Sequence, residues 1–408
     1  MKIQLWSYNY DPEPTGIAPL SRVWVHAMRE RGHEVDVVAA HPHYPEPVWG
    51  VRRRPYRELR DGVPVTRLPL WIGRATATQR MRQEATFAGA LALAAPWLGR
   101  RPDVIVAVSP SFPALGPAML NAWARRVPWV LWLQDILPDG ASATGLVDAG
   151  PLLQAARRFE RAAYRAAAHV VVLSDTFREN LRDKGVPDAK ITKIYNPASR
   201  PVATAPRPPD AGEPNAVLTM GNIGYSQNLE AMVRAFEANE ELEEADATMV
   251  LAGDGMACEA VRDAINTHRV RITGIIDDEA LTRELERAKV ALVSQHYEGA
   301  EFNVPSKLMN FMGQGLATVA SVGPHSEVSR ILEASEGGWV TDSSHPEEAA
   351  RTLAEVLRQP EEVARRSANA LDFARANFTA AHCAERFEKV LDAVLVDRVP
   401  HTAQGTSG

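Results

Sequence analysis

The feature that most constrains the fold is a repeated alternation of short apolar strands with helical segments. An apolar run at 3–7 is followed by a loop rich in turn formers, a helix from Leu20 to Arg31 and a strand at 34–39. Two strands joined through a helix lie parallel with a right-handed crossover. The alternation stops at 201–214, which holds five prolines, and restarts with a strand at 217–220. The sequence therefore predicts an α/β protein with two parallel-sheet domains.

The domain boundaries follow from the same pattern. A chain of 408 residues is too long for one ordinary core. We expect an N-terminal domain at 1–200, a linker at 201–214 and a second domain at 215–380, then a last helix at 381–396 and a disordered tail at 397–408. The first βαβ unit lacks the GxGxxG fingerprint, which disfavours a Rossmann dehydrogenase.

The run at 304–321 is the most informative stretch for function. It indicates a helix with Pro305 in its first turn, Ser306 as its N-cap and Gly315 as its stop, then a strand at 316–320. Such a helix starts at the carboxyl edge of a parallel sheet, where its free N–H groups suit a phosphate. Lys307 in the first turn opposes the helix dipole by about 0.3–1 kcal/mol if exposed. We explain it by a diphosphate that neutralises it; a solvated surface lysine is the alternative.

Two further candidate sites lie in the N-terminal domain. Gln134 and Asp135 follow the buried strand at 129–133, at an edge where open α/β sheets place their ligands. Asp135 is the first choice for an acid or base that faces the acceptor, and the alternative is an aspartate that caps the next turn. His43 lies in a proline-rich loop, where acceptor binding and an ordinary loop are both open. Two histidines so close in a loop, without cysteines or paired acids, give a weak metal signal.

Composition narrows the class. The net charge of −6 argues against a nucleic-acid partner. The two cysteines give neither a disulfide framework nor metal spacing and fit a reducing cytoplasm. The chain opens directly on a strand without a signal-peptide pattern, and it has no run of about 20 apolar residues. The basic and apolar segment 74–101 either lies on the inner face of a membrane or covers the sheet.

The motifs, taken in order, resemble those of GT-B glycosyltransferases of family GT4. Pro305–Gly315 is similar to the family's donor-binding motif, and the resemblance continues through Gln134-Asp135, Gly221-Asn-Ile-Gly and Gly253-Asp-Gly. It is closest to the bacterial polysaccharide branch with colanic-acid-type and fucosaminyl transferases. The resemblance implies a GT-B fold of two Rossmann-like parallel-sheet domains facing a cleft, with a last helix that crosses back to the first domain.

The resemblance also implies the site, residue by residue. Where the family usually grips the diphosphate with Arg and Lys, this chain has Asn222 and Gln227, so Lys307 and the backbone N–H groups of 224–226 must do more. Asn310 replaces the glutamate that holds the ribose. The glutamate that touches the donor sugar falls on Phe302, with Glu301 or Glu298 as substitutes. The full donor-binding set is Gly16, Asn222, Gly224, Gln227, Gly274, Ile275, Glu301, Asn303, Val304, Ser306 and Asn310; the acceptor-binding set is Thr15, Arg22, His43 and Gln134; Asp135 and Lys307 are catalytic.

The implied activity is retaining, metal-independent glycosyl transfer. The donor would be a UDP- or GDP-sugar, and the acceptor a hydroxyl or other nucleophile of a lipid-linked saccharide or a small natural product. No cofactor and no metal are expected, and the enzyme would be cytoplasmic, with peripheral membrane contact through 74–101. Two alternatives stay open: a nucleotide-sugar epimerase or phosphorylase of the same fold, and a non-catalytic partner subunit. The reason for the partner-subunit alternative is that this chain lacks the family's Arg, Lys and Glu at these positions.

Overall fold

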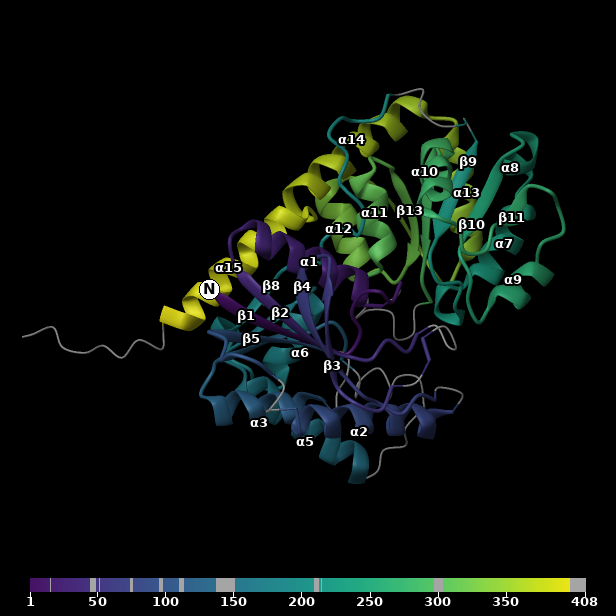
Figure 1. Ribbon diagram of the computed structural model, residues 1–408. Coiled ribbons are helices and arrows are strands. Elements are labelled where there is room, and N and C mark those ends of the chain that lie inside the picture. Colours follow the sequence, from purple (N-terminus) through teal and green to yellow (C-terminus); the bar gives the residue numbers. More distant parts are fainter. Residues whose placement is uncertain are drawn as a thin grey trace, which may run out of the picture. The chain divides into compact units, whose positions relative to one another are not determined.

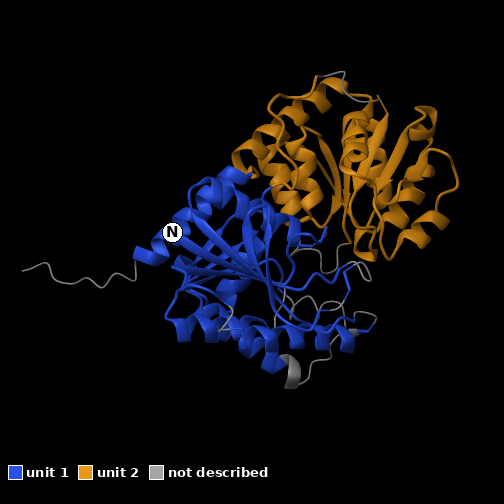
Figure 2. Cartoon of the chain, viewed as in Figure 1, with its two compact units in different colours: residues 1–197, 380–408 blue, residues 198–379 orange. Residues whose placement is uncertain are grey.

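The computed structural model consists of two compact units (Figure 2). Unit 1 comprises Met1–Pro197 together with the chain from Ala380 onward, and unit 2 comprises Ala198–Thr379. The structure describes residues 1–14, 16–44, 49–50, 52–73, 76–94, 98–109, 114–136, 151–208, 213, 215–296 and 304–396. Every statement below refers to these residues.

Unit 1 is built on a sheet with the strand order β3-β4-β2-β1-β5-β6-β7-β8. Its described strands are β1 (Lys2–Ser7), β2 (Glu34–Ala40), β3 (Tyr56–Arg60), β4 (Val63–Leu68), β5 (Val104–Val108), β6 (Trp129–Trp132), β7 (His169–Val172) and β8 (Ile191–Lys193). All neighbours pair in parallel except β3, which forms an antiparallel hairpin with β4. The chain runs from β1 outward to β2 and later returns to β5 on the other side of β1. The carboxyl ends of β1 and β5 therefore form the topological switch point, where open α/β sheets bind ligands.

Helices cover both faces of this sheet. The described ones are α1 (Ala18–Glu30), α2 (Ala77–Ala92), α3 (Leu115–Arg125), α5 (Pro151–Ala166), α6 (Asp175–Asp183) and α15 (Ala380–Val396). Figure 1 shows α2, α3 and α5 along one face and α1 and α15 on the other. Ser174 caps α6, because its side chain accepts a hydrogen bond from the N–H of Phe177.

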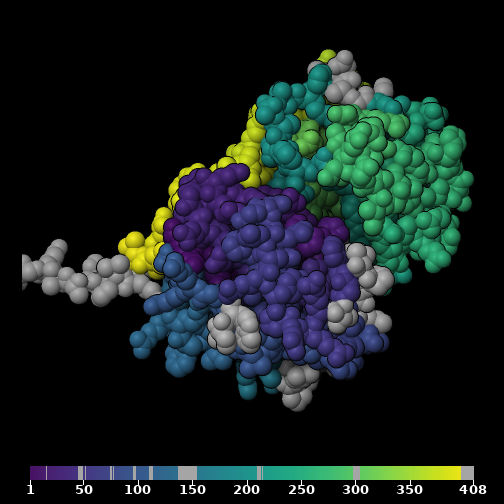
Figure 3. Space-filling model, viewed as in Figure 1, coloured from purple at the N-terminus to yellow at the C-terminus, as the bar shows by residue number. Residues whose placement is uncertain are grey.

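The last helix completes the core of unit 1. Phe387 of α15 packs edge-on against Trp24 of α1 and Trp132 of β6, with ring centroids 5.3 and 5.0 Å apart, and all three side chains are buried. In Figure 3 this C-terminal helix, in yellow, lies directly beside the purple N-terminal segments. Buried aromatic pairs of this kind add about 0.5–1.5 kcal/mol each beyond the area they bury. The final helix is thus a structural part of the unit that the first residues build.

Unit 2 holds a fully parallel sheet with the order β11-β10-β9-β12-β13-β14. The described strands are β9 (Ala216–Met220), β10 (Thr248–Ala252), β11 (Val270–Ile272), β12 (Val290–Ser294), β13 (Thr318–Val322) and β14 (Gly338–Asp342). Its helices are α7 (Leu229–Glu237), α8 (Glu240–Glu244), α9 (Cys258–Asp263), α10 (Asp278–Arg287), α11 (Ser306–Gly313), α12 (Glu327–Ser335), α13 (Pro346–Leu357) and α14 (Pro360–Asn377). Its switch point lies between β9 and β12, because the strands on one side of β9 are filled before the chain returns to β12.

The helix predicted at 304–315 is present, but its start differs. Helix α11 begins at Ser306, and its N-cap is Pro305, which makes no side-chain cap. The prediction of Ser306 as the N-cap is therefore wrong, because Pro305 keeps an extended backbone (φ −69°, ψ 128°) while Ser306 is already helical. The predicted stop at Gly315 is confirmed. Its N–H donates to Met312 O and that of Leu316 donates to Phe311 O, which is a Schellman closure around a positive φ of 65°.

The segment predicted as a linker is attached to unit 2. The Ala203 N–H donates to Gly313 O at 2.8 Å, and the Arg207 guanidinium donates to the carbonyls of Leu285, Glu286 and Ala288. The division between the units falls between Pro197 and Ala198. Residues 198–208 are therefore held by hydrogen bonds to the second sheet's helices.

Candidate active site

The site in unit 2 lies at the switch point between β9 and β12. The loop after β9 runs through Asn222 and Gly224 into a short 3-10 turn, Tyr225–Gln227. Helix α11 begins beyond β12 and carries Lys307 in its first turn. The loops after β9 and β10 approach backbone to backbone, since a Cβ on Gly253 would lie 1.8 Å from Gly221 O. Glycine is thus required where the second loop supports the first.

Lys307 is buried rather than solvated. It is 7% exposed, and its Nζ donates a hydrogen bond to Gln227 Oε1 at 2.6 Å. Burial lowers the pKa of Lys307 to about 8. Within the described part of the chain, no carboxylate lies within ion-pair distance of this ammonium. A buried cation without a counter-charge is costly, so the position suits an anionic ligand.

The loop after β9 lies against this lysine. A Cβ on Gly221 would be 3.8 Å from Lys307 Cε, and a Cβ on Gly224 would come within 2.7 Å of Asn222 Nδ2. Gln227 is itself 9% exposed. The structure therefore brings together four residues singled out from the sequence: Asn222, Gly224, Gln227 and Lys307. Because Gln227 is neutral, it accepts a hydrogen bond from Lys307 where a second lysine would repel it.

Asn310 lies one turn further along α11. Its Oδ1 is 3.2 Å from both Ser199 Oγ and the N–H of Arg200, and its Nδ2 donates to Ser199 Oγ at 2.9 Å. The side chain thus ties the helix to the segment that enters unit 2. A carboxylate could accept here but could not donate, which gives a local reason for an amide at this position.

The remaining residues predicted to bind the donor differ in how exposed they are. Gly274 has a φ of +72°, and Ile275 beside it is 85% exposed. Tyr225 and Met256 are also exposed, so the loops after three adjacent strands, β9, β10 and β11, each present a solvent-facing apolar side chain. Such side chains can cover a planar base. Val304 is buried and Ser306 is exposed, while Glu301 and Asn303 lie outside the described residues.

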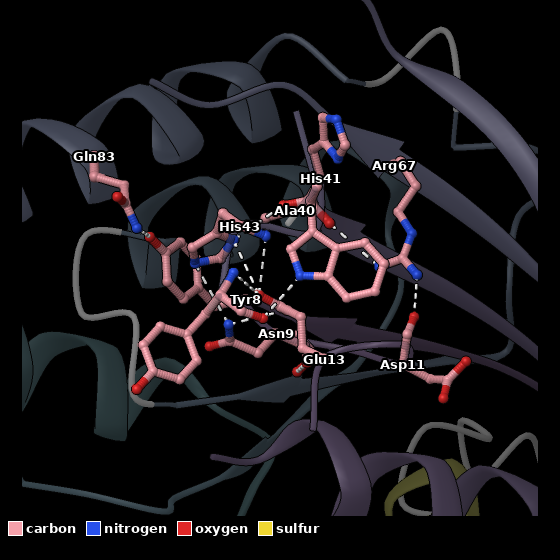
Figure 4. A network of polar contacts seen from close by, with 12 residues as sticks. Tyr8, Asn9, Asp11, Glu13, Ala40, His41, His43, Arg67 and Gln83 are labelled. Carbon is pink, nitrogen blue, oxygen red and sulfur yellow. Dashed lines mark hydrogen bonds and ion pairs between the residues drawn. The ribbon is translucent and has the colours of Figure 1, made fainter. Parts of the chain in front are cut away.

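The site in unit 1 centres on a buried carboxylate that the sequence reasoning missed (Figure 4). The Glu13 side chain is fully buried in the loop after β1. Its Oε1 accepts from the N–H groups of His43 and Tyr44, at 3.1 and 2.9 Å, and its Oε2 accepts from Asn9 Nδ2 at 3.0 Å. Glu13 therefore joins the loop after β1 to the loop after β2. Between two prolines it has the sequence context of an exposed turn, and only the tertiary contacts bury it.

A buried arginine supports the same loop. Arg67 of β4 is fully buried, and its guanidinium donates to Asp11 O, Ala40 O and Glu58 Oε1. It thus links the loop after β1 to the end of β2 from the other side. The loops after β1 and β2 are held together by charge-assisted hydrogen bonds, which are stronger than neutral ones.

His43 is part of this support. Its ring is enclosed, with Nδ1 3.0 Å from His41 O, Nε2 3.4 Å from Asn9 Nδ2, and the Tyr8 ring packed edge-on at 4.8 Å. Nδ1 also lies 3.4 Å from Glu13 Oε1, so the ring packs against the same carboxylate that joins the two loops. The ring therefore has no exposed edge that an acceptor could contact. The prediction that the His43 side chain binds the acceptor is wrong.

The other acceptor-side candidates have different surroundings. Gln134 forms a reciprocal amide pair with Asn196, at 3.0 and 2.7 Å. Asp135 is an exposed residue, but desolvation by the surrounding protein raises the pKa of its carboxyl. The hydrogen bond from the N–H of Ile136 lowers that pKa by a smaller amount. A carboxyl with a raised pKa at a sheet edge suits proton transfer. Arg22 is half exposed and forms an ion pair with Asp61 at 2.9 Å.

Gly16 adopts a φ of +64° with open space around the position of a Cβ, so backbone conformation rather than crowding requires glycine. Thr15 lies outside the described residues. No cluster of three or more metal-binding side chains occurs within the part of the chain that the structure describes.

Two α/β units, each with a polar site at the carboxyl ends of its strands, form the architecture of the GT-B fold. Solved structures support this fold over nearly the whole chain. One is HepE from Anabaena, solved with UDP and glucose. The match covers 96% of this chain and all of HepE, with a TM-score of 0.68 and 16% identity. Sucrose-phosphate synthase from Thermosynechococcus elongatus covers 97% with 99% of its own length, at a TM-score of 0.70 and 17% identity.

The chain belongs to the GT4-type glycosyltransferases. Residues 15–197 match the glycosyl transferase 4-like domain, and residues 204–373 match the glycosyl transferases group 1. The putative colanic acid biosynthesis glycosyl transferase WcaI of Escherichia coli is 26% identical over 361 residues, which span 83% of this chain and 87% of that protein. The probable glycosyltransferase WbjE of Pseudomonas aeruginosa is 24% identical over 275 residues, 63% of this chain and 66% of that protein. The predicted family and fold are confirmed, and the protein is a glycosyltransferase enzyme.

Proposed function

We propose that the protein transfers a sugar from a UDP- or GDP-sugar to a saccharide acceptor, with retention of anomeric configuration and without a metal ion. The observation that carries this proposal is the buried Lys307 ammonium in the first turn of α11 at the switch point. The start of a helix and a desolvated cation together form a site for a diphosphate. HepE, which shares the fold, has been solved with UDP and with UDP-glucose, which supports a nucleotide-sugar donor.

In the proposed donor complex, Lys307 contacts the diphosphate and the N–H groups of the turn beginning at Gly224 add hydrogen bonds. Gln227 holds the lysine in place, and the backbone at Gly274 and Ile275 cups the base. These groups stabilise the negative charge that develops on the leaving diphosphate. They would supply the support that a metal ion gives in other transferases, so we propose that neither a metal nor another cofactor is needed.

The chemical step we propose is a front-face displacement. The bond from the anomeric carbon to the diphosphate oxygen breaks, and a bond from the same face of that carbon to the acceptor oxygen forms. The acceptor proton passes to the leaving phosphate oxygen. Asp135, with its raised pKa, orients the acceptor hydroxyl, and Gln134 and Arg22 lie on the acceptor side. His43 acts through the loop that it supports.

For the acceptor we propose a saccharide, either lipid-linked or part of a small natural product. The name of WcaI, colanic acid biosynthesis, supports polysaccharide assembly. We place the enzyme in the cytoplasm, in contact with the inner face of a membrane. None of the described helices is long and apolar enough to span a bilayer. Helix α2 buries Phe87 and Leu91 in the unit, so the segment 74–101 uses much of its apolar surface to cover the sheet.

Calorimetry with UDP and GDP tests the proposal. We expect one of the two to bind the full chain with similar affinity in EDTA and in Mg²⁺. NMR of the product should show the donor's anomeric configuration. Failure of both nucleotides to bind would refute the donor assignment, and turnover that EDTA abolishes and Mg²⁺ restores would refute the metal-free mechanism.

A further inference from the structure

An apolar groove with a basic border lies on unit 1, away from the switch point. It has a volume of about 1080 Å³ and runs along α3 past the start of β6 and the end of α5, lined in part by Met119, Leu120, Trp123, Trp129 and Ala167. Its floor is formed where β6 begins, which is the edge of the sheet opposite to the carboxyl ends. The groove therefore belongs to neither proposed substrate site.

The outer wall of the groove is unusually apolar for a surface. Trp123 is 78% exposed and Leu120 is 55% exposed. They are three residues apart on α3 and share one side of the helix. Leu93, at the end of α2, is also 75% exposed, and Asn121 donates to Leu91 O, so this end of α2 lies beside α3. Exposed apolar clusters of this kind mark interaction surfaces.

The border of the groove is basic, and its Arg and Lys side chains donate hydrogen bonds to uncharged carbonyl and amide oxygens. Arg101 donates to Arg126 O, Arg125 to Gln4 Oε1 and to the carbonyls of Gly99 and Arg100, and Lys190 to the carbonyls of Arg165 and Ala167. Among the described residues, no carboxylate lies within ion-pair distance of Arg101, Arg125 or Lys190. Several other arginines are paired with carboxylates, as Arg178 is with Asp188 and Arg271 with Glu284. The border thus carries three cations without a carboxylate partner among the described residues, in a chain whose net charge is −6.

The neighbouring helix α5 adds to the positive charge. It exposes Arg157, Arg158, Arg161 and Arg165, while its one acid, Glu160, is buried and paired with Lys184 at 2.9 Å. Figure 1 shows α3 and α5 along the same face of the sheet. The surface thus combines an exposed tryptophan, exposed leucines and guanidinium groups.

We propose that this α3–α5 surface docks unit 1 on an anionic lipid bilayer, with Trp123 and Leu120 entering the interface and the basic border contacting lipid phosphates. Tryptophan favours the headgroup region, and each Lys or Arg near an anionic surface contributes to binding. A symmetric dimer through this surface would set the same cations against each other. The inference deepens the proposed function, on which it rests for the lipid-linked class of acceptor. It assigns the membrane contact to α3 and the basic border, which takes only the last part of segment 74–101, with Arg101.

Sedimentation of the full chain with vesicles tests the inference. We expect the protein to bind phosphatidylcholine vesicles that contain phosphatidylglycerol, and not vesicles of phosphatidylcholine alone. The double variant L120S/W123S should lower partitioning by about tenfold or more, because two large apolar groups are removed. R101Q/K190Q should lower it by about 25-fold, at roughly fivefold for each cation, and weaken its salt dependence. Leu59→Ser is the matched control, since Leu59 is 72% exposed on β3 of the same unit.

Thermal unfolding and UDP or GDP binding, measured on each variant, separate this inference from the proposed function. Normal nucleotide binding without vesicle binding by the wild type refutes the docking surface alone, whereas vesicle binding without nucleotide binding refutes the donor assignment alone. Unchanged partitioning of L120S/W123S would also overturn the inference. So would a wild-type dimer, detected by light scattering, that this double variant dissociates.

Discussion

Replacement of Lys307 by methionine separates the two roles of this side chain. Burial lowers the pKa of the lysine from 10.5 to about 8, which corresponds to about 3 kcal/mol against the charged form in the ligand-free fold. Below about pH 8 the ammonium is charged in the folded and unfolded chain, and this cost is fully present. Between about 8 and 10.5 the unfolded state binds more protons, so stability rises with pH.

Methionine removes the buried charge but also the hydrogen bond to Gln227, which is worth about 1 kcal/mol. Lys307→Met should therefore leave the ligand-free protein at neutral pH at least as stable as the wild type, by up to about 2 kcal/mol. The diphosphate loses its buried cation, so the Kd for the bound nucleotide should rise by about 100-fold. Wild-type affinity should fall as the pH rises above about 8, and the affinity of the variant should not.

Calorimetry across this pH range, with thermal unfolding, measures both effects. Lys289→Met is the matched control, because Lys289 is 8% exposed but lies before the amino end of β12, away from the switch point. Wild-type nucleotide affinity in Lys307→Met would refute the reasoning. An equal loss in Lys289→Met would show that any buried lysine of unit 2 has the same effect.

Three further predictions follow from buried groups. Glu13→Ala should lower the free energy of unfolding by about 2–4 kcal/mol in a denaturant titration, because three donors, one of them fully buried, lose their acceptor. Glu13→Gln should lower it less; equal effects would contradict the charge-assisted role. Gly253→Ala should abolish nucleotide binding at retained helix content, since its Cβ would displace Gly221 in the loop beside Lys307; normal binding would contradict that tight approach. Burial raises the pKa of Cys383 to about 12, and Cys258 is also buried, so a thiol reagent should modify both only after unfolding; rapid reaction of the native protein would contradict this.

The sequence predicted the elements whose signals are local. The strands at 3–7 and 217–220 are apolar and short, and Gly315 has the conformational freedom that a left-handed helix stop needs. Lys307 and Gln227 were placed at the same diphosphate by the family resemblance, not by a local pattern. Their hydrogen bond gives that expectation a geometry.

The sequence did not predict what depends on distant partners. Glu13 is buried by the backbone of residues thirty positions away, which no local pattern indicates. Strand β3 was missed because its charged residues Arg57, Glu58 and Arg60 give no apolar pattern, although the strand pairs in register with β4. His43 was assigned to the acceptor by its position in a loop, and only the packing of Tyr8 and Asn9 shows that its ring is enclosed.

The return of α15 to unit 1 has a consequence for how the chain is made. Because the chain leaves this unit at Pro197 and re-enters at Ala380, unit 2 is inserted within unit 1. During synthesis, Trp24 and Trp132 lack their partner Phe387 until α15 emerges, by which point all the described strands of unit 2 have been made. An excised 198–379 fragment should fold by itself, whereas a 1–197 fragment would keep an open aromatic core and tend to aggregate.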